Sequence, residues 1–190
     1  FNLFALCLAI LLCSFQSANA CSNSVKNPTA VYGDTHWDAH GSTTIATLVG
    51  GNQCFQVLKS DAHFKQDISI PSGSGFVNIS GWTRNSQASA PTGHAYLYAY
   101  VMDGNGQILE YVQFGVTNTG MIWKKASKKV TLAGGATTIR LFLKKSSKKG
   151  VADTGNMAYF DNLAVTFDCV KTFAAPGSEC ANLLLNTDAN

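Results

Sequence analysis

Short runs in which apolar and polar residues alternate recur from Cys21 to about residue 168, and they constrain the fold more than any other feature. A two-residue period is typical of strands with one buried face, and no segment shows the 3.6-residue stripe of an amphipathic helix. The expected strands are Thr43–Leu48, Cys54–Leu58, Phe64–Ile70, Val77–Arg84, Ala95–Met102, Ile108–Phe114, Lys129–Leu132, Thr137–Lys144 and Met157–Phe167. So many short strands separated by turn residues predict an all-β fold, a two-sheet antiparallel β-sandwich.

The ends of the chain differ from this pattern. Phe1 to Phe15 is almost continuously apolar, and the small residues Ala18 and Ala20 follow it. An apolar run followed by small residues is typical of a secretory signal peptide, whereas a membrane anchor, the alternative, requires a longer run. We therefore predict a signal over residues 1–20, a β-sandwich domain over 21–169, and a tail or linker over 170–190. The expected location is extracellular, without a membrane span.

Removal of the signal leaves Cys21, Cys54, Cys169 and Cys180. An even number of cysteines in a secreted chain predicts two disulfides, and the sequence leaves all three connectivities open. A zinc site is the alternative, but no closely spaced Cys or His pair supports it.

The segment Gly93–Gly106, GHAYLYAYVMDGNG, contains the most distinctive strand. Tyrosines alternate there with small aliphatic residues, and turn chemistry follows at Asp103–Gly106. Two interpretations are open for Tyr96, Tyr98 and Tyr100. They pack a core, or they form an aromatic platform whose faces stack on the apolar faces of sugars.

The order of several motifs is familiar. These are Phe64–Ile70, Val77–Arg84, the tyrosine strand, Trp123 with Ser127, Thr138–Leu141 and the closing Ala158–Val165. Over roughly residues 25–168 the chain resembles the carbohydrate-binding modules of the galactose-binding-like jelly-roll group, related to families 4, 9, 16 and 22. The resemblance implies a jelly-roll sandwich, a polysaccharide or glycan as partner, and a non-catalytic role.

The resemblance also implies an orientation for the strands, because the residue two before the terminal Asp of such a strand faces the core. Leu97, Ala99 and Val101 then point inward and the three tyrosines outward. By the same reasoning Trp82 and Arg84 point outward on their own strand. The expected ligand-binding residues share one sheet face, and they are Trp82, Arg84, Tyr96, Tyr98 and Tyr100, with Tyr111 and Gln113 as neighbours on the next strand.

A structural calcium ion is a further implication of the resemblance. Members of the group often hold one near the first strand and a closing Tyr/Phe-Asp-Asp motif. Asp161 matches the first Asp of that motif, but Asn162 replaces the second. The early stretch Asn27–Val31 lacks the expected Glu, so backbone carbonyls would have to supply further oxygen ligands.

Lysines gather in two similar segments, Lys124–Lys129 and Lys144–Lys149. They indicate an alternative function, an extracellular structural or adhesive protein that binds anionic surfaces through lysine-rich loops. A solvated rim that keeps strand edges from pairing is the simpler interpretation. Nucleic acid is not expected as a partner, because the chain has a secretory signal and only Trp123 interleaves with the lysines.

An enzyme is not expected. A glycosidase needs two positioned carboxylates, and the domain offers Glu110 as its only glutamate, with Asp103 in a turn. His36, His40, His63 and His94 are scattered along the chain, and no recognisable Ser-His-Asp or Cys-His arrangement accompanies them.

Overall fold

The structure, a computed structural model, describes residues 22–87, 93–117, 121–147 and 155–168. The described residues form strands joined by turns and loops. The strands are β1 (Asp38–His40), β2 (Thr43–Thr47), β3 (Gln53–Val57), β4 (His63–Ser69), β5 (Phe76–Asn85), β6 (Gly93–Asp103), β7 (Ile108–Thr117), β8 (Lys124–Thr131), β9 (Ala136–Ser147) and β10 (Ala158–Phe167).

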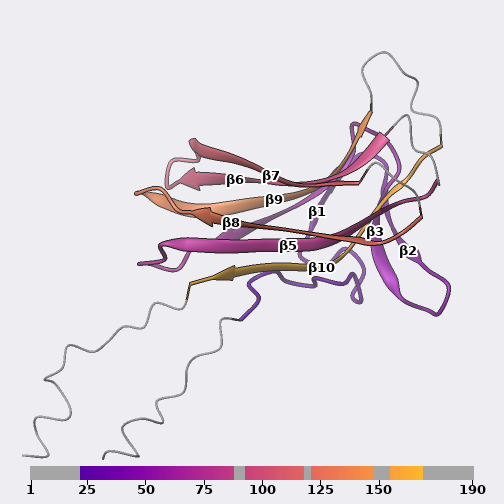
Figure 1. Cartoon of the computed structure of the whole chain (residues 1–190), viewed down its shortest axis with the longest axis horizontal. Helices are drawn as coiled ribbons and strands as arrows, with labels where there is room; N and C mark the ends of the chain where they lie inside the picture. The colour runs from indigo at the N-terminus through magenta and orange to yellow at the C-terminus, as the bar shows by residue number, and fades with distance from the viewer. Residues whose placement is uncertain (1–21, 88–92, 118–120, 148–154, 169–190) are drawn as a thin grey trace, which may run out of the picture.

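The strands form two five-stranded sheets that lie face to face (Figure 1). Sheet A has the order β1-β4-β9-β6-β7, and sheet B has the order β2-β3-β10-β5-β8. Neighbouring strands in both sheets are antiparallel. The predicted β-sandwich of jelly-roll type is therefore confirmed. Within the described ranges, no helix is long and apolar enough to cross a membrane.

Each strand expected from the alternating pattern overlaps a strand of the structure, and two differences stand out. The sequence pattern missed β1, because its residues Asp38–His40 are all exposed and carry no apolar alternation. This strand forms by pairing with β4. In addition, β8 begins at Lys124 rather than at Lys129, because its lysines pair with β5 along an exposed sheet edge.

The core lies between the sheets and consists of the inward residues of the alternating strands. Phe55, Phe160 and Leu97 are fully buried, and the Trp37 ring packs on Phe55 with ring centroids 4.9 Å apart. Each such side chain contributes about 1.5–3 kcal/mol through the removal of apolar surface from water. This core fixes which face of each strand remains outside.

Two glycines make room for Leu97 in that core. A Cβ atom at Gly115 on β7 would lie 2.8 Å from the Leu97 Cβ. A Cβ atom at Gly81 on β5 would lie 3.0 Å from the Leu97 Cδ1 and 2.8 Å from the Leu163 Cδ2. Leu97 is thus packed against the backbone of both sheets, at Gly115 and at Gly81, where a larger residue would collide with it.

A tight turn joins β6 to β7 and sets their register. The Asp103 Oδ1 accepts hydrogen bonds from the backbone amides of Asn105 (2.9 Å) and Gln107 (2.8 Å). Gly106 completes the turn with a φ of 80°, a conformation that glycine adopts without steric cost. The turn expected from the sequence is confirmed, and it places β7 beside the tyrosine strand.

The segment before β1 is held by two side-chain amides, the buried Gln66 and the exposed Asn23. The Gln66 side chain accepts from the Lys26 amide (2.9 Å) and donates to the carbonyls of Lys26 and His36, each at 3.0 Å. The Asn23 side chain donates to the Leu163 carbonyl (2.8 Å) and accepts from the Val165 amide (2.9 Å). These bonds tie the segment to both sheets.

The predicted disulfides require a correction at Cys54. This residue lies on β3, is fully buried and is a free thiol. Burial raises its pKa to about 11, with the Asp161 carboxylate adding to the effect, so the reactive thiolate is disfavoured. Cys21, Cys169 and Cys180 lie outside the described residues, as do the predicted signal and tail, and those predictions stand untested.

Candidate functional site

The orientation predicted for the tyrosine strand is correct. Leu97, Ala99 and Val101 on β6 are fully buried between the sheets. Because side chains alternate along a strand, the tyrosines at positions 96, 98 and 100 lie on the outer face of sheet A. The alternative interpretation, in which the tyrosines pack the core of the sandwich, is therefore wrong.

A continuous line of rings crosses this outer face diagonally, from one transverse line of paired residues to the next. We call it the aromatic row, and it comprises His40 (β1), His63 (β4), Phe142 (β9), Tyr98 and Tyr100 (β6), and Tyr111 (β7). The His40 and His63 rings stack with centroids 5.0 Å apart, and His63 lies 5.4 Å from Phe142. Phe142 and Tyr98 stack almost in parallel, 4.6 Å apart at an angle of 7°.

The tyrosine end of the row is a cluster of three rings. Tyr98, Tyr100 and Tyr111 lie pairwise 5.6–5.7 Å apart in tilted or edge-on arrangements. The Tyr111 hydroxyl contacts the Gln113 Oε1 at 3.4 Å. Tyr96 stands apart from this cluster, and its ring lies 6.3 Å from His94.

The rings of the row differ in their access to solvent. Tyr98 is only 9% exposed because Phe142 and the other tyrosines surround it, whereas Tyr111 is 53% exposed. Burial raises the pKa of Tyr98, and the neighbouring hydroxyls of Tyr100 and Tyr111 act in the same direction. Tyr111 and the half-buried Tyr100 thus offer ring surface to a ligand, and Tyr98 supports them from beneath.

Trp82 and Arg84 do not belong to this face, which corrects the sequence prediction. Both side chains point outward from β5, as expected, but β5 lies in sheet B, and the tyrosines lie in sheet A. On sheet B, Arg84 lies over the Tyr159 ring, with its Cζ 5.6 Å from the ring centroid. The sandwich therefore separates the two groups of predicted contact residues onto opposite surfaces.

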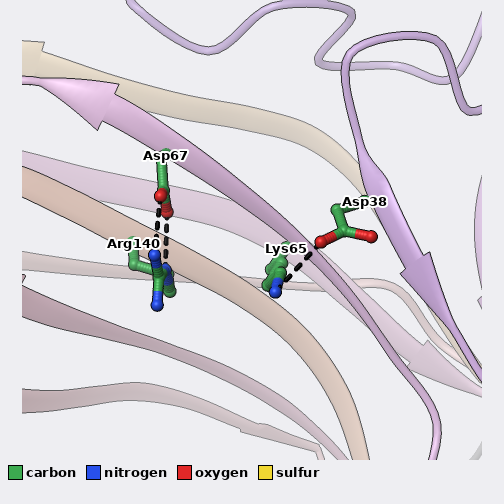
Figure 2. Close-up of polar contacts among 4 residues, drawn as sticks. All are labelled: Asp38, Lys65, Asp67 and Arg140. Carbon is green, nitrogen blue, oxygen red and sulfur yellow. Dashed lines mark hydrogen bonds and ion pairs between the residues drawn. The ribbon is translucent and has the colours of Figure 1, made fainter.

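Two ion pairs lie on the same face, because Lys65 pairs with Phe142 and Arg140 with Tyr100 across neighbouring strands. Figure 2 shows both ion pairs. The Arg140 guanidinium on β9 makes a bidentate contact with Asp67 on β4, with both N–O distances 2.7 Å. This contact holds the pKa of Asp67 below its usual range, so the carboxylate stays ionised. Lys65 pairs with Asp38 across β4 and β1 at 2.9 Å.

Residues of both ion pairs, Asp38, Lys65 and Asp67, line a hollow at the β1–β4 edge of the sheet. Its volume is about 490 Å³, and Lys26, His36, Gln66 and Ser69 line it together with both carboxylates. The hollow forms here because β1 covers only the first half of β4. The outer face of sheet A thus combines apolar rings with charged hydrogen-bonding groups at one end.

Sequence reasoning missed the half of the row that comes from β1, β4 and β9. The alternation of β9, with Ile139, Leu141 and Leu143 inward, implied that Arg140 and Phe142 point outward. Nothing local indicated that β9 lies between β4 and β6. The histidines looked scattered because their two strands are far apart in sequence.

The position predicted for calcium, Asp161, lies at a hollow of about 410 Å³ that Thr29, Val31, Asn52, Gln53 and Asn162 also line. Burial raises the pKa of Asp161, and the Asn162 amide opposes this by donating to its Oδ1 at 2.8 Å. With its amide nitrogen turned toward them, Gln53 donates to the carbonyls of Ala30 (2.9 Å) and Val31 (3.1 Å).

The Gln53 amide competes with calcium for oxygen atoms of this hollow. Gln53 occupies the carbonyl oxygens that a cation would need, since calcium takes six to eight oxygen ligands. Among the described residues, no group of three or more His, Cys, Asp or Glu residues is placed to hold a metal ion, so backbone and amide oxygens would have to supply most ligands at Asp161. Binding of calcium at Asp161 thus depends on whether the ion displaces the Gln53 amide from these carbonyls.

We expect millimolar Ca²⁺ to change the melting temperature of the wild-type protein by less than about 1 °C relative to EDTA, because Gln53 already satisfies both carbonyls. Q53E removes that amide donor and adds a second carboxylate beside Asp161, so the variant should gain a calcium-dependent rise in melting temperature. Differential scanning fluorimetry with and without EDTA measures both. A large calcium-dependent rise in the wild type would show that an ion displaces the Gln53 amide.

The lysine segments are not the loops that the sequence suggested. Lys124, Lys125, Lys128 and Lys129 lie on β8, at the edge of sheet B. The Lys129 Nζ lies 3.6 Å from the centroid of the Phe76 ring. In the second segment, Lys145 is fully buried on β9 and donates to the Leu58 carbonyl at 3.0 Å, and positions 148 and 149 lie outside the described residues.

Comparisons with known proteins agree with this architecture. No protein-family model and no curated protein sequence matches the chain. Among solved structures, it is similar to the enzymatically active domain of the bacteriophage CBA120 tailspike protein 4, with a TM-score of 0.59 and 16% identity, covering 76% of this chain and 21% of the tailspike chain.

Two further similar structures are carbohydrate-binding modules. One is the module TmCBM61 in complex with β-1,4-galactotriose, with a TM-score of 0.54 and 15% identity over 77% of this chain and 99% of that chain. The other is the xylan-binding domain CBM22-1 of Paenibacillus barcinonensis Xyn10C, with a TM-score of 0.54 and 16% identity over 80% of this chain and 97% of that one. At these identities the likeness establishes the fold that the chain shares with such modules.

Proposed function

We propose that the protein is a secreted, non-catalytic carbohydrate-binding domain and that it binds a polysaccharide on the outer face of sheet A. The observation that carries the proposal is the aromatic row, in which rings from five strands adjoin the bidentate Arg140–Asp67 pair. The shared fold with carbohydrate-binding modules supports the same function.

Two kinds of group on this face suit sugars. The exposed ring of Tyr111 and the half-buried ring of Tyr100 provide apolar surfaces on which sugar rings stack. Arg140 and Asp67 hold each other in place through their bidentate contact. The N–H groups and lone pairs that this contact leaves unused can bind sugar hydroxyls in a fixed orientation. Stacking then supplies affinity, and the charged groups set the orientation of sugar hydroxyls.

The length of the row favours a chain of sugars over a single sugar. Adjacent strands lie about 4.8 Å apart, so a row that crosses five strands extends over roughly 19 Å. A monosaccharide would cover only part of that distance. We therefore assign the face to an extended oligosaccharide segment that runs across the strands.

The carboxylates of this face argue for binding without hydrolysis. Hydrolysis of a glycosidic bond needs one carboxyl group that is protonated and one that is ionised. Asp67 stays ionised because Arg140 lowers its pKa, and Asp38 is paired with Lys65. Asp67 is therefore not held as a proton donor.

The prediction that tests the function compares two aromatic substitutions on opposite sheets. We expect Y111A to weaken retention on a binding polysaccharide by on the order of tenfold, because an exposed aromatic anchor is lost. W82A removes an aromatic side chain from sheet B and should leave retention unchanged. Affinity electrophoresis against a panel of neutral and acidic soluble polysaccharides measures both variants.

Equal retention of Y111A and the wild type, or retention on no polysaccharide at all, would refute the proposed function. The alternative is an adhesive role for the exposed lysines of β8, which form a positively charged sheet edge. That role would be supported if retention were insensitive to Y111A and disappeared at high salt, because salt screens exposed charges.

A further inference from the structure

The two histidines of the aromatic row lie in a strongly basic part of sheet A. Cross-strand pairing aligns His40 with His63, His63 with Lys144, and Lys144 with Tyr96. Residues paired in this way share a face, so one transverse line carries two imidazoles, one ammonium group and a phenol ring. Lys65 lies on the same face in the next line, beside Phe142.

The carboxylates of the face do not balance this charge. Asp38 is engaged by Lys65 at 2.9 Å, and Asp67 by Arg140 at 2.7 Å. Lys144 has no carboxylate partner among the residues that the structure describes. Lys144 is therefore an uncompensated positive charge on this face, and protonation of the histidines adds to it.

We propose that the glycan bound on sheet A carries carboxylate groups and that His63 and Lys144 bind one of them beside the Phe142–Tyr98 stack. This inference rests on the proposed function and adds the substrate class, a polysaccharide containing uronic acid residues. A uronic acid has the same ring faces for stacking as a neutral sugar, and its carboxylate supplies the negative charge that this corner lacks. An ion pair next to partly buried rings is also less screened than one in open solvent.

Protonation of His63 is expected to make the affinity for an acidic glycan depend on pH. Burial lowers the pKa of His63, and the adjacent His40, Lys144 and Lys65 lower it further, while Asp38 opposes them. A bound carboxylate would favour the protonated imidazole and raise that pKa again. Binding then takes up a proton, so affinity for the acidic glycan rises as the pH falls from 7.5 to 5.5. The carboxylates of the glycan stay ionised over this range, because such groups titrate near pH 3–4.

The test compares polygalacturonate and alginate with their methyl esters, which keep the sugar chain and remove the charge. We expect the wild type to bind at least one acidic polymer several-fold more tightly than its ester, and about threefold to tenfold more tightly at pH 5.5 than at pH 7.5. H63Q should abolish most of the pH dependence, and K144Q should weaken binding of the acidic polymer alone. Isothermal titration calorimetry at both pH values measures these differences, and melting temperatures confirm that the variants are folded.

K125Q is the matched control, because Lys125 is an exposed lysine on β8 of the opposite sheet. It should leave binding unchanged. The inference is overturned if each acid and its ester bind equally, if binding does not depend on pH, or if K125Q weakens binding as much as K144Q. Binding of the esters or of neutral polymers, sensitive to Y111A, would leave the proposed function intact in that case. Retention on none of the polymers in either form would reject both.

Discussion

Replacement of Leu97 by alanine is expected to lower the free energy of unfolding by about 2–5 kcal/mol, near the upper end of that range. Leu97 is fully buried in the middle of the sandwich, and residues of both sheets close around it. The β strands on either side of β6 hold the backbone, so the cavity left by the side chain cannot collapse easily. Chemical denaturation of the wild type and L97A measures the difference.

Substitution of Gly81, alone and combined with L97A, tests whether Gly81 and Leu97 share the same space in the core. In the wild type, G81A should cost about 1–3 kcal/mol, because the new methyl group meets the ends of Leu97 and Leu163 at 3.0 and 2.8 Å. In the L97A background one of these contacts is gone and the methyl group partly fills the cavity. The double variant should therefore be more stable than the sum of the single effects predicts. Strict additivity would show that Gly81 and Leu97 do not share this space.

Replacement of Tyr98 by alanine should also cost stability, by about 2–4 kcal/mol. Only 9% of Tyr98 is exposed, and its ring stacks on Phe142 at 4.6 Å while touching two further tyrosines. This role differs from the one that the sequence alone predicts for Tyr98, namely direct contact with a ligand. Thermal and chemical denaturation test the expected loss.

Y98F is the appropriate control, because it keeps the ring and removes only the hydroxyl. We expect its stability to lie within about 1 kcal/mol of the wild type, and its polysaccharide retention to be unchanged. A stable Y98A protein that no longer binds polysaccharide would contradict this role and identify Tyr98 as a direct ligand contact. A destabilised Y98A with a normal Y98F would establish Tyr98 as the support of the more exposed rings.

The roles of Leu97 in the core and of Tyr98 as a support show how much of the structure can be predicted from the pattern within one strand. The sequence determined which residues form strands and which way their side chains point, as Leu97 and Tyr98 show, because alternation is a property of consecutive residues. It also located the turn at Asp103–Gly106, because its hydrogen bonds lie within a few residues. The inward and outward sides of β5 were likewise predicted correctly, including the outward position of Trp82.

Only the tertiary structure decided which strands are neighbours. Trp82 and the tyrosines point outward on strands of different sheets, whereas His63 and Phe142 join the tyrosines from strands distant in sequence. The lysines expected in a loop form an edge strand for the same reason, because β5 supplies their partner. Strand neighbours in a sandwich are set by the packing of two sheets around a common core, and no pattern within a single strand records that choice.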